Sequence, residues 1–152
     1  EPAGRRAFEH YLPGPGIIAA FPLDAWPHLV PHIKERARRK QGYAGRLTAT
    51  EEKLAGRVLD ELAARGPLTS DDIAHEGRAR SGWGTPGRAV RVVLQKLFAH
   101  GRVLISNRRQ FRRVYDLPER VLPAAVLAAP MPDQQEHQRW LIRQRLLQRR
   151  LV

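Results

Sequence analysis

Cysteine is absent from the 152-residue sequence. Its absence excludes disulfide bonds, thiolate nucleophiles and zinc sites built on cysteine. No hydrophobic run approaches the roughly 18 residues that a membrane-spanning helix needs, and no signal-peptide pattern opens the sequence. We therefore expect a soluble, intracellular protein that does not enter a membrane.

Lysine and acidic residues are also scarce. Only four of the 27 basic residues are lysine, and 15 acidic residues leave a formal net charge of +12. The guanidinium group of arginine matches phosphates and guanine edges better than an ammonium group does. Nucleic acid is therefore the first partner to consider, and a generally basic, solvated surface is the alternative.

The central feature of the sequence is a predicted helix that ends directly before a hairpin. Thr85 suits an N-cap, Pro86 suits the first helical position, and Gly101 suits a left-handed C-cap. These signals predict a helix over about 86–100. One apolar stripe runs along it at three- and four-residue spacing, formed by Val90, Val93, Leu94, Leu97 and Phe98.

Two segments rich in β-branched and aromatic residues follow this helix, at 102–106 and 110–117. Between them, Asn107-Arg108-Arg109 is predicted to form a polar turn, because Asn tolerates a left-handed conformation. The hairpin has no acid before Asp116 and carries five arginines, namely Arg102, Arg108, Arg109, Arg112 and Arg113.

Two further helices are predicted upstream. Thr48 and Glu51 form a capping box for a helix that ends at Gly66, with an apolar face of Leu54, Val58, Leu59 and Leu62. Pro67-Leu68 leaves room for only a short extended piece. Thr69 to Asp72 then caps a short helix, DDIAHE, and GRARSGWG is predicted to connect it to the helix at 86–100.

The order of helix, short strand, helix, connector, helix and hairpin is that of a winged helix. We therefore predict a mostly α fold with a small β-hairpin, in which residues 47–121 form a winged helix-turn-helix domain. Residues 1–46 would connect it to an upstream domain, and residues 122–152 would form a linker and the first helix of a following domain.

The flanking segments are less regular. Prolines and glycines up to Pro22 predict a loop or an extended crossing piece, and Asp24 can cap a helix toward Arg39 that Pro31 kinks or splits. His28 and His32 have the spacing of metal ligands but no third ligand beside them, so we expect no metal and no cofactor.

The C-terminal part is predicted to hold a single turn at 118–120, a proline-rich linker and a last helix that begins at Asp133. This helix is basic and amphipathic, as a peptide on a membrane surface would be. A helix separated from its own domain shows the same exposed stripe, and we favour that interpretation.

A winged helix places its third helix in the DNA major groove and its hairpin on the flanking backbone or minor groove. Double-stranded DNA is therefore the predicted partner. The candidate DNA-binding residues are Arg80 and Trp83 in the connector, Arg88, Arg91 and Lys96 on the third helix, and Arg108, Arg109, Arg112 and Arg113 on the hairpin. Trp83 could instead anchor the connector to the core, and a winged helix can also bind protein rather than DNA.

The segments GPLTSDDIAHEGRARSGWG at 66–84 and LFAHGRVLISNRRQFRRVYDLPERVLP at 97–123 closely resemble the bacterial YcaQ-like winged-helix DNA glycosylases. Members of this family unhook interstrand crosslinks and remove alkylated purines from DNA. The resemblance implies tandem winged helices, of which this chain would cover the end of the first, all of the second and the opening helix of the third. It also implies damaged duplex DNA as the partner and a cytoplasmic, nucleoid-associated location.

One departure from the family concerns catalysis. The family signature, a glutamine followed by an apolar residue and then aspartate or glutamine, does not occur in the sequence. The nearest text, Gln134-Gln135-Glu136, follows Asp133 and suits a capping box better. We therefore assign no catalytic residue and expect this segment alone to be inactive, although the parent protein would hydrolyse N-glycosidic bonds.

The main alternative is a winged-helix transcriptional regulator. A regulator would use Arg88 and Arg91 on base edges of a particular sequence, commonly as a symmetric dimer. A glycosylase would bind with little sequence preference, and for it we favour a monomer. A protein-interaction module would show no salt-dependent DNA binding at all.

Overall fold

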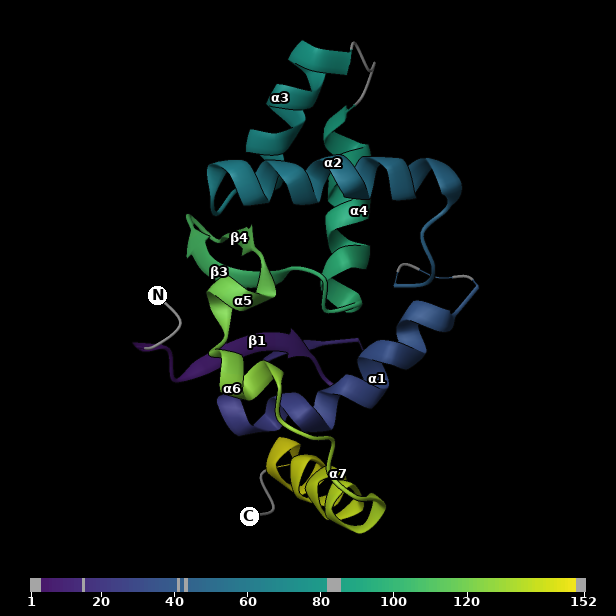
Figure 1. The fold of residues 1–152 in the computed structure, drawn as a ribbon. Coiled ribbons are helices and arrows are strands. Elements are labelled where there is room, and N and C mark those ends of the chain that lie inside the picture. Colours follow the sequence, from purple (N-terminus) through teal and green to yellow (C-terminus); the bar gives the residue numbers. More distant parts are fainter. Residues whose placement is uncertain (1–3, 15, 41, 43, 82–85, 150–152) are drawn as a thin grey trace.

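The computed structural model describes residues 4–14, 16–40, 42, 44–81 and 86–149. The described part is mostly helical and contains two small antiparallel hairpins, in agreement with the predicted fold class. In chain order the elements are β1 (Ala7–Tyr11), β2 (Ile18–Pro22), the 3-10 helix η2 (Leu23–Ala25), α1 (Trp26–Arg38), α2 (Ala49–Arg65), α3 (Ser70–Ser81), α4 (Pro86–Ala99), β3 (Leu104–Arg109), β4 (Arg112–Asp116), α5 (Pro118–Val121), α6 (Ala124–Leu127) and α7 (Gln134–Gln148). Among these, α2, α3, α4 and the β3–β4 hairpin follow the order of a winged helix, so we call this hairpin the wing (Figure 1).

The predicted capping signals of α2 and α3 are confirmed. Thr48 accepts a hydrogen bond from the Glu51 N–H while Glu51 accepts one from the Thr48 N–H, and α2 ends at Gly66 with φ of 88°. Thr69 and Asp72 make the same reciprocal pair before α3. The predicted length of α3 was wrong, because the helix runs through Gly77 to Ser81 and takes up most of the expected connector.

α4 has the predicted bounds and the predicted inward face. All five residues of its apolar stripe are buried, and Val93, Leu94, Leu97 and Phe98 have no exposed surface. At its C-terminus the Gly101 N–H bonds to the Phe98 carbonyl and the Arg102 N–H to the Leu97 carbonyl, which together form a Schellman motif. Gly101 has φ of 69°, and a β-carbon there would meet Ile33 of α1 at 3.2 Å. Glycine is therefore required both for the turn and for the close approach of α1.

The wing forms where the sequence predicts a hairpin, but its turn lies three residues later than expected. Arg109 pairs with Arg112, so the turn consists of Gln110 and Phe111, which both have positive φ. Asn107 instead follows a β-bulge between Ile105 and Asn107. The bulge leaves one residue of β3 unpaired and lets the strand continue to Arg109, which explains the shift of the turn.

A third, very short strand completes the sheet of the winged helix. Leu68 forms an isolated antiparallel bridge with Tyr115, with N–H to carbonyl distances of 3.0 and 2.8 Å. This is the short extended piece predicted at Pro67-Leu68. It ties the segment between α2 and α3 to β4.

The segment after the wing is held by Arg120. Its guanidinium group donates to the carbonyls of Leu62 and Ala63, at 2.8 and 2.9 Å, and to Asp116 at 3.3 Å. These carbonyls belong to the last turns of α2, where a cation also complements the helix dipole. Asp116 and Arg120, which lie in the segment that resembles the glycosylases, thus join the wing and the single turn α5 to α2.

The N-terminal segment, predicted to be a loop or an extended crossing piece, is extended and pairs with itself. β1 and β2 form a regular antiparallel hairpin from the pair of Ala7 and Pro22 to the pair of Tyr11 and Ile18. Pro13, Gly14 and Gly16 lie in the turn, where the Leu12 N–H bonds to the Ile17 carbonyl. α1 follows, and Pro31 lies inside it without dividing it.

Two clusters of buried side chains form the interior, and β3 contributes to both. The first lies among α2, α3, α4 and the wing, and includes Ile105. The second lies among the N-terminal hairpin, α1 and the α5 region, and includes Phe8, Leu104 and Leu122. Because successive side chains of a strand point to opposite faces, the neighbours Leu104 and Ile105 enter different clusters. The division of the chain at residues 47 and 122 stays a prediction.

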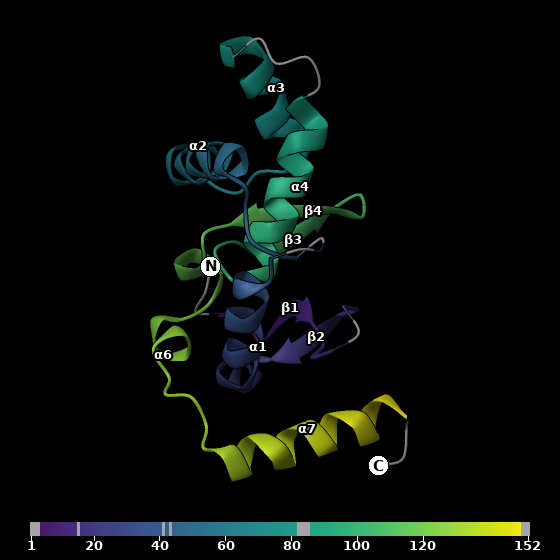
Figure 2. The ribbon, with the colours of Figure 1, turned by 90° about the vertical axis from the view of Figure 1, so that its right-hand side faces the viewer.

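The predicted linker contains the short helix α6, and α7 then crosses one end of the molecule (Figure 2). Asp133 and Glu136 form the predicted capping box of α7. Trp140 is the main anchor of α7, because its ring stacks on His28 at 4.8 Å and lies 6.3 Å from the ring of Phe21. In the part of the chain that the structure describes, none of the helices is long and apolar enough to cross a membrane.

We predict that Leu97→Ala lowers the free energy of unfolding by roughly 2–5 kcal/mol, because it leaves a cavity at the centre of the first cluster. Val92→Ala is the matched control, since Val92 lies on the same helix with a 39% exposed side chain. Chemical denaturation of both variants measures the difference. A loss below about 0.5 kcal/mol for Leu97→Ala, the size expected at a surface site, would contradict the assignment of the buried face.

Stability should also depend on the protonation of His10. This residue is fully buried, with Nε2 at 2.9 Å from the Phe98 carbonyl, and burial lowers its pKa to about 4. Below pH 6.5, His10 therefore binds a proton in the unfolded chain but stays neutral in the native state. The free energy of unfolding falls as the pH falls toward 4. At pH 4 this difference in protonation of His10 lowers the free energy of unfolding by roughly 3 kcal/mol relative to neutral pH. Unfolding free energies between pH 7.5 and 4.5 should fall less steeply for His10→Gln, and an unchanged slope would contradict the prediction. His75→Gln is the control, because His75 is exposed.

Candidate nucleic-acid interface

The solvent-facing side of α4 is the first part of the candidate interface. Arg88 and Arg91 are exposed and Gln95 is half-buried, at a spacing that puts them on one side of the helix. Within the described part of the chain, neither arginine has an acidic partner. Both guanidinium groups are therefore free to bind a ligand.

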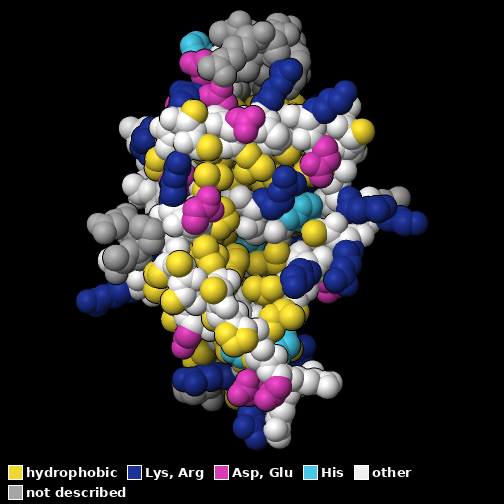
Figure 3. Space-filling model, viewed as in Figure 1, with side chains coloured by type: hydrophobic (Ala, Val, Ile, Leu, Met, Phe, Trp, Pro, Cys, Tyr) yellow, Lys and Arg dark blue, Asp and Glu magenta, His cyan; other side chains and the backbone are white. Residues whose placement is uncertain are grey.

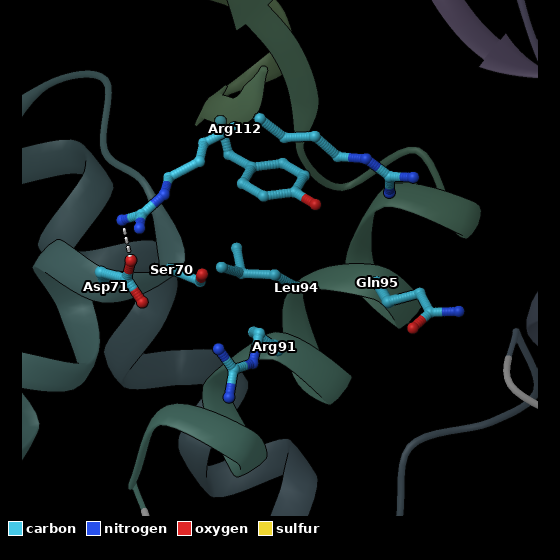
Figure 4. Close-up of a pocket in the computed structure, with 8 residues that line it drawn as sticks. Ser70, Asp71, Arg91, Leu94, Gln95 and Arg112 are labelled. Atoms are coloured by element: carbon cyan, nitrogen blue, oxygen red, sulfur yellow. Dashed lines mark hydrogen bonds and ion pairs between the residues drawn. The ribbon is translucent and has the colours of Figure 1, made fainter. Parts of the chain in front are cut away.

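A groove lies beside this face, between α4, β4 and the start of α3. Its volume is about 450 Å³, and its lining residues are Ser70, Asp71, Arg91, Leu94, Gln95, Arg112, Arg113 and Tyr115. In Figure 4, Arg112 reaches toward Asp71 of α3, while Arg91 and Gln95 extend from α4. The fold thus brings the predicted residues Arg91, Arg112 and Arg113 together, with Arg88 one turn before Arg91.

Three wing arginines have acidic partners that the sequence did not reveal. Arg112 is ion-paired with Asp71, and the Arg109 guanidinium lies 4.0 Å from Asp72. On the other side of the wing, Arg108 donates two hydrogen bonds to Glu9 of β1, at 2.7 and 3.2 Å. These pairs are exposed, so a DNA phosphate can replace the carboxylate. The binding free energy gained is then only the difference between the arginine–phosphate pair and the arginine–carboxylate pair that it replaces.

Arg108 also has a structural role at the tip of the wing. Its Nη1 atom donates to the Phe111 carbonyl at 3.2 Å, in addition to the two bonds with Glu9. The side chain therefore links the turn of the wing to the N-terminal hairpin.

Arg113 and Lys96 are engaged in the fold. The Arg113 guanidinium lies 5.8 Å from the centre of the Phe98 ring. Burial alone would lower the pKa of Arg113, but the phenols of Tyr115 and Tyr11 raise it. Lys96 donates to Glu51 at 2.9 Å and to the Arg46 carbonyl at 3.2 Å, and it does not line the groove.

The ion pair of Lys96 joins α4 to the start of α2. Burial alone would raise the pKa of Glu51, but hydrogen bonds from the Thr48 N–H and the Lys96 ammonium group lower it. Glu51 is thus ionised at neutral pH and holds Lys96 in place. A DNA contact of Lys96 stays a prediction.

Two other predicted DNA-binding residues cannot be placed in the groove. The backbone of Arg80 belongs to α3, but its side chain lies outside the described residues, as does the whole of Trp83. Their contacts with DNA stay predictions.

The histidines with metal-ligand spacing meet a third histidine from α7. His137 lies with Nδ1 at 3.4 Å from Nδ1 of His28 and with Nε2 at 3.1 Å from Nε2 of His32. Because opposite nitrogens of one imidazole face the two partners, a single ion cannot bind all three rings. Among the described residues, no group of three or more His, Asp or Glu side chains has the geometry of a metal site. Burial and the proximity of His137 lower the pKa of His28 and His32, so the neutral rings hold α7 on α1.

The charge of the molecule is not gathered in one patch on the face shown in Figure 3. Lysine and arginine side chains are interspersed there with aspartate and glutamate.

A model of the family described as "DNA glycosylase AlkZ-like" matches residues 2–151 of the sequence. The chain therefore belongs to the AlkZ-like DNA glycosylase family, and the family resemblance of residues 66–123 is confirmed. Among solved structures, the chain is similar to Streptomyces sahachiroi DNA glycosylase AlkZ, with 18% sequence identity and a TM-score of 0.48. The similarity covers 92% of this chain and 39% of that one.

If the groove binds DNA, Asp71→Asn should increase affinity for a short duplex by roughly 2- to 5-fold, because it removes a negative charge and releases Arg112. Glu35→Gln is the matched control, since it breaks an exposed ion pair with Arg39 on α1. Fluorescence anisotropy at low salt measures both. An equal gain in the two variants would mean that only net charge matters, and no gain for Asp71→Asn would remove Arg112 from the interface.

Proposed function

We propose that this chain is the DNA-binding winged-helix segment of a DNA repair glycosylase that hydrolyses N-glycosidic bonds of alkylated or crosslinked purines. Membership of the AlkZ-like family supports the enzyme class. The observation that carries the role of the segment is the groove in which Arg91 and Gln95 of α4 meet Arg112 of the wing. Its partner would be damaged double-stranded DNA in the cytoplasm, bound by a monomer.

The groove suits a duplex for physical reasons. Arg88, Arg91 and Gln95 lie along one side of α4, where a winged helix presents side chains to base edges and phosphates. The wing places further arginines beside the same groove, at a position suited to the flanking backbone. Neutralising the phosphates with these arginines would release the counterions of the duplex, so this contact should depend strongly on salt.

The chemistry of base removal requires groups that this segment does not supply. Hydrolysis of an N-glycosidic bond needs a carboxylate or an amide that positions water against a sugar with oxocarbenium character. The glutamine-containing triplet of the family is absent from the sequence, and in the nearest text, Gln134-Gln135-Glu136, Glu136 caps the N-terminus of α7 together with Asp133. The segment would therefore bind the duplex rather than catalyse base removal.

The proposal predicts duplex binding with a steep dependence on salt. With about five phosphate contacts, log K should fall with log salt at a slope near −4 to −5. Arg88→Ala and Arg91→Ala should each weaken binding by roughly 1–3 kcal/mol, because both arginines lie on the groove side of α4 and neither has an acidic partner among the described residues.

The matched control for these two variants is Arg139→Ala. Arg139 is exposed on α7, which lies at the opposite end of the molecule from α3 (Figure 1). The Arg139→Ala substitution removes the same charge and should leave the binding free energy unchanged within about 0.5 kcal/mol. A flat salt response of the parent chain would contradict the proposal. Strong preference for one selected sequence over random duplexes would favour a transcriptional regulator instead.

A further inference from the structure

The tip of the wing carries a side chain that the fold does not use. Phe111 is 93% exposed, the highest value among the large hydrophobic residues that the structure describes as exposed. It shares a two-residue turn with Gln110, and the φ angles of the two residues are 68° and 51°. Phe111 thus combines a solvent-facing aromatic ring with a left-handed backbone.

Neither property is explained by local stability. A two-residue hairpin turn with positive φ at both positions is of type I′, which favours Asn-Gly, and glycine at the second position relieves the strain. Burying the ring would also be favourable, and yet it projects into solvent. A strained backbone that presents an exposed group is typical of a functional position.

The strained tip is held in place from two sides. Arg108 donates to the Phe111 carbonyl at 3.2 Å and is itself bound by Glu9. The adjacent Arg112 is paired with Asp71 of α3. The ring is therefore presented on a rigid support, which lowers the entropy lost when it contacts a ligand.

The surroundings of the ring indicate the chemistry of its partner. Arg109 and Arg112 flank the turn, Arg108 donates a hydrogen bond to the Phe111 carbonyl, and Arg112 also lines the groove beside α4. Cations around an aromatic ring suit a ligand that joins phosphates to flat aromatic rings. Nucleic acid has both features, since its bases stack on aromatic side chains and its backbone binds arginine.

We propose that Phe111 is an aromatic wedge that stacks on a base at a distorted step of duplex DNA. This inference rests on the proposed function. It adds a preference for damaged DNA to the general affinity of α4 and the wing for duplex DNA. Inserting a side chain between base pairs requires unstacking, which costs less where a base is missing or unpaired. Phe111 would therefore contribute little on an intact duplex and more on a distorted one.

Phe111→Gly provides a sharp test, because glycine fits the turn better than phenylalanine and the wing should remain folded. The probes are two otherwise identical duplexes, one intact and one with a tetrahydrofuran abasic analogue opposite 2-aminopurine. Loss of one stacked ring should lower affinity for the abasic duplex by roughly 5- to 100-fold. Affinity for the intact duplex should change less than twofold, and the salt slope should stay the same because no charge is removed.

Phe111→Tyr should restore both the affinity and the 2-aminopurine fluorescence change, since it keeps the ring. Ile142→Ala is the matched control, because Ile142 is a 56% exposed apolar residue on α7. Equal affinities of the parent and Phe111→Gly for the abasic duplex would overturn the wedge and leave the proposed function standing. An equal loss on both duplexes would also overturn it, because the ring would then be a general contact. A parent chain that shows no salt-dependent binding to either duplex would overturn the proposed function as well.

Discussion

The position of the wing depends on one strand that two hydrophobic clusters share. Leu104 and Ile105 of β3 are both fully or almost fully buried, and they enter opposite clusters because neighbouring side chains of a strand alternate. Neither cluster can repack without moving this strand. The base of the wing is thus fixed relative to α4 on one side and to the N-terminal hairpin on the other. The ion pairs of Arg112 with Asp71 and of Arg108 with Glu9 extend this restraint toward the tip.

These ion pairs change the meaning of the basic composition. A count of arginines in the wing suggests a strongly cationic hairpin, but Asp71, Asp72 and Glu9 each lie beside one of its guanidinium groups. The unpaired cations of the candidate interface are instead Arg88 and Arg91 on the exposed side of α4, as far as the described residues show. We infer that the unpaired arginines of α4 supply most of the electrostatic attraction for DNA, and that the wing contributes mainly through the shape of its surface.

The sequence predicted the features that depend on near neighbours. Thr48, Thr69 and Asp133 were recognised as helix caps because the reciprocal acid lies three residues away, and Gly101 because a helix must stop before a hairpin. The N-terminal hairpin was missed, since its stability comes from packing Phe8 and Phe21 into a cluster that also contains Leu122. The turn of the wing was misplaced because a β-bulge beside Asn107 has no clear sequence signal. The ion partners of Arg108 and Arg112 were missed because they lie 99 and 41 residues away.

In the proposed function, the rigid wing with its strained, exposed ring would recognise damage, while other residues bind the duplex. Phosphate contacts are nearly the same on intact and damaged duplexes, so the proposed contacts of the α4 arginines would not distinguish the two by themselves. The proposed stacking of Phe111 would depend on how easily a base step opens, which is a property of the lesion rather than of the base sequence. The wedge can exploit this difference only if the tip does not yield when it meets a well-stacked step. In this proposal the bonds from Arg108 to Glu9 and to the Phe111 carbonyl would supply that resistance, so Arg108, which the sequence predicts to contact DNA, would also support Phe111.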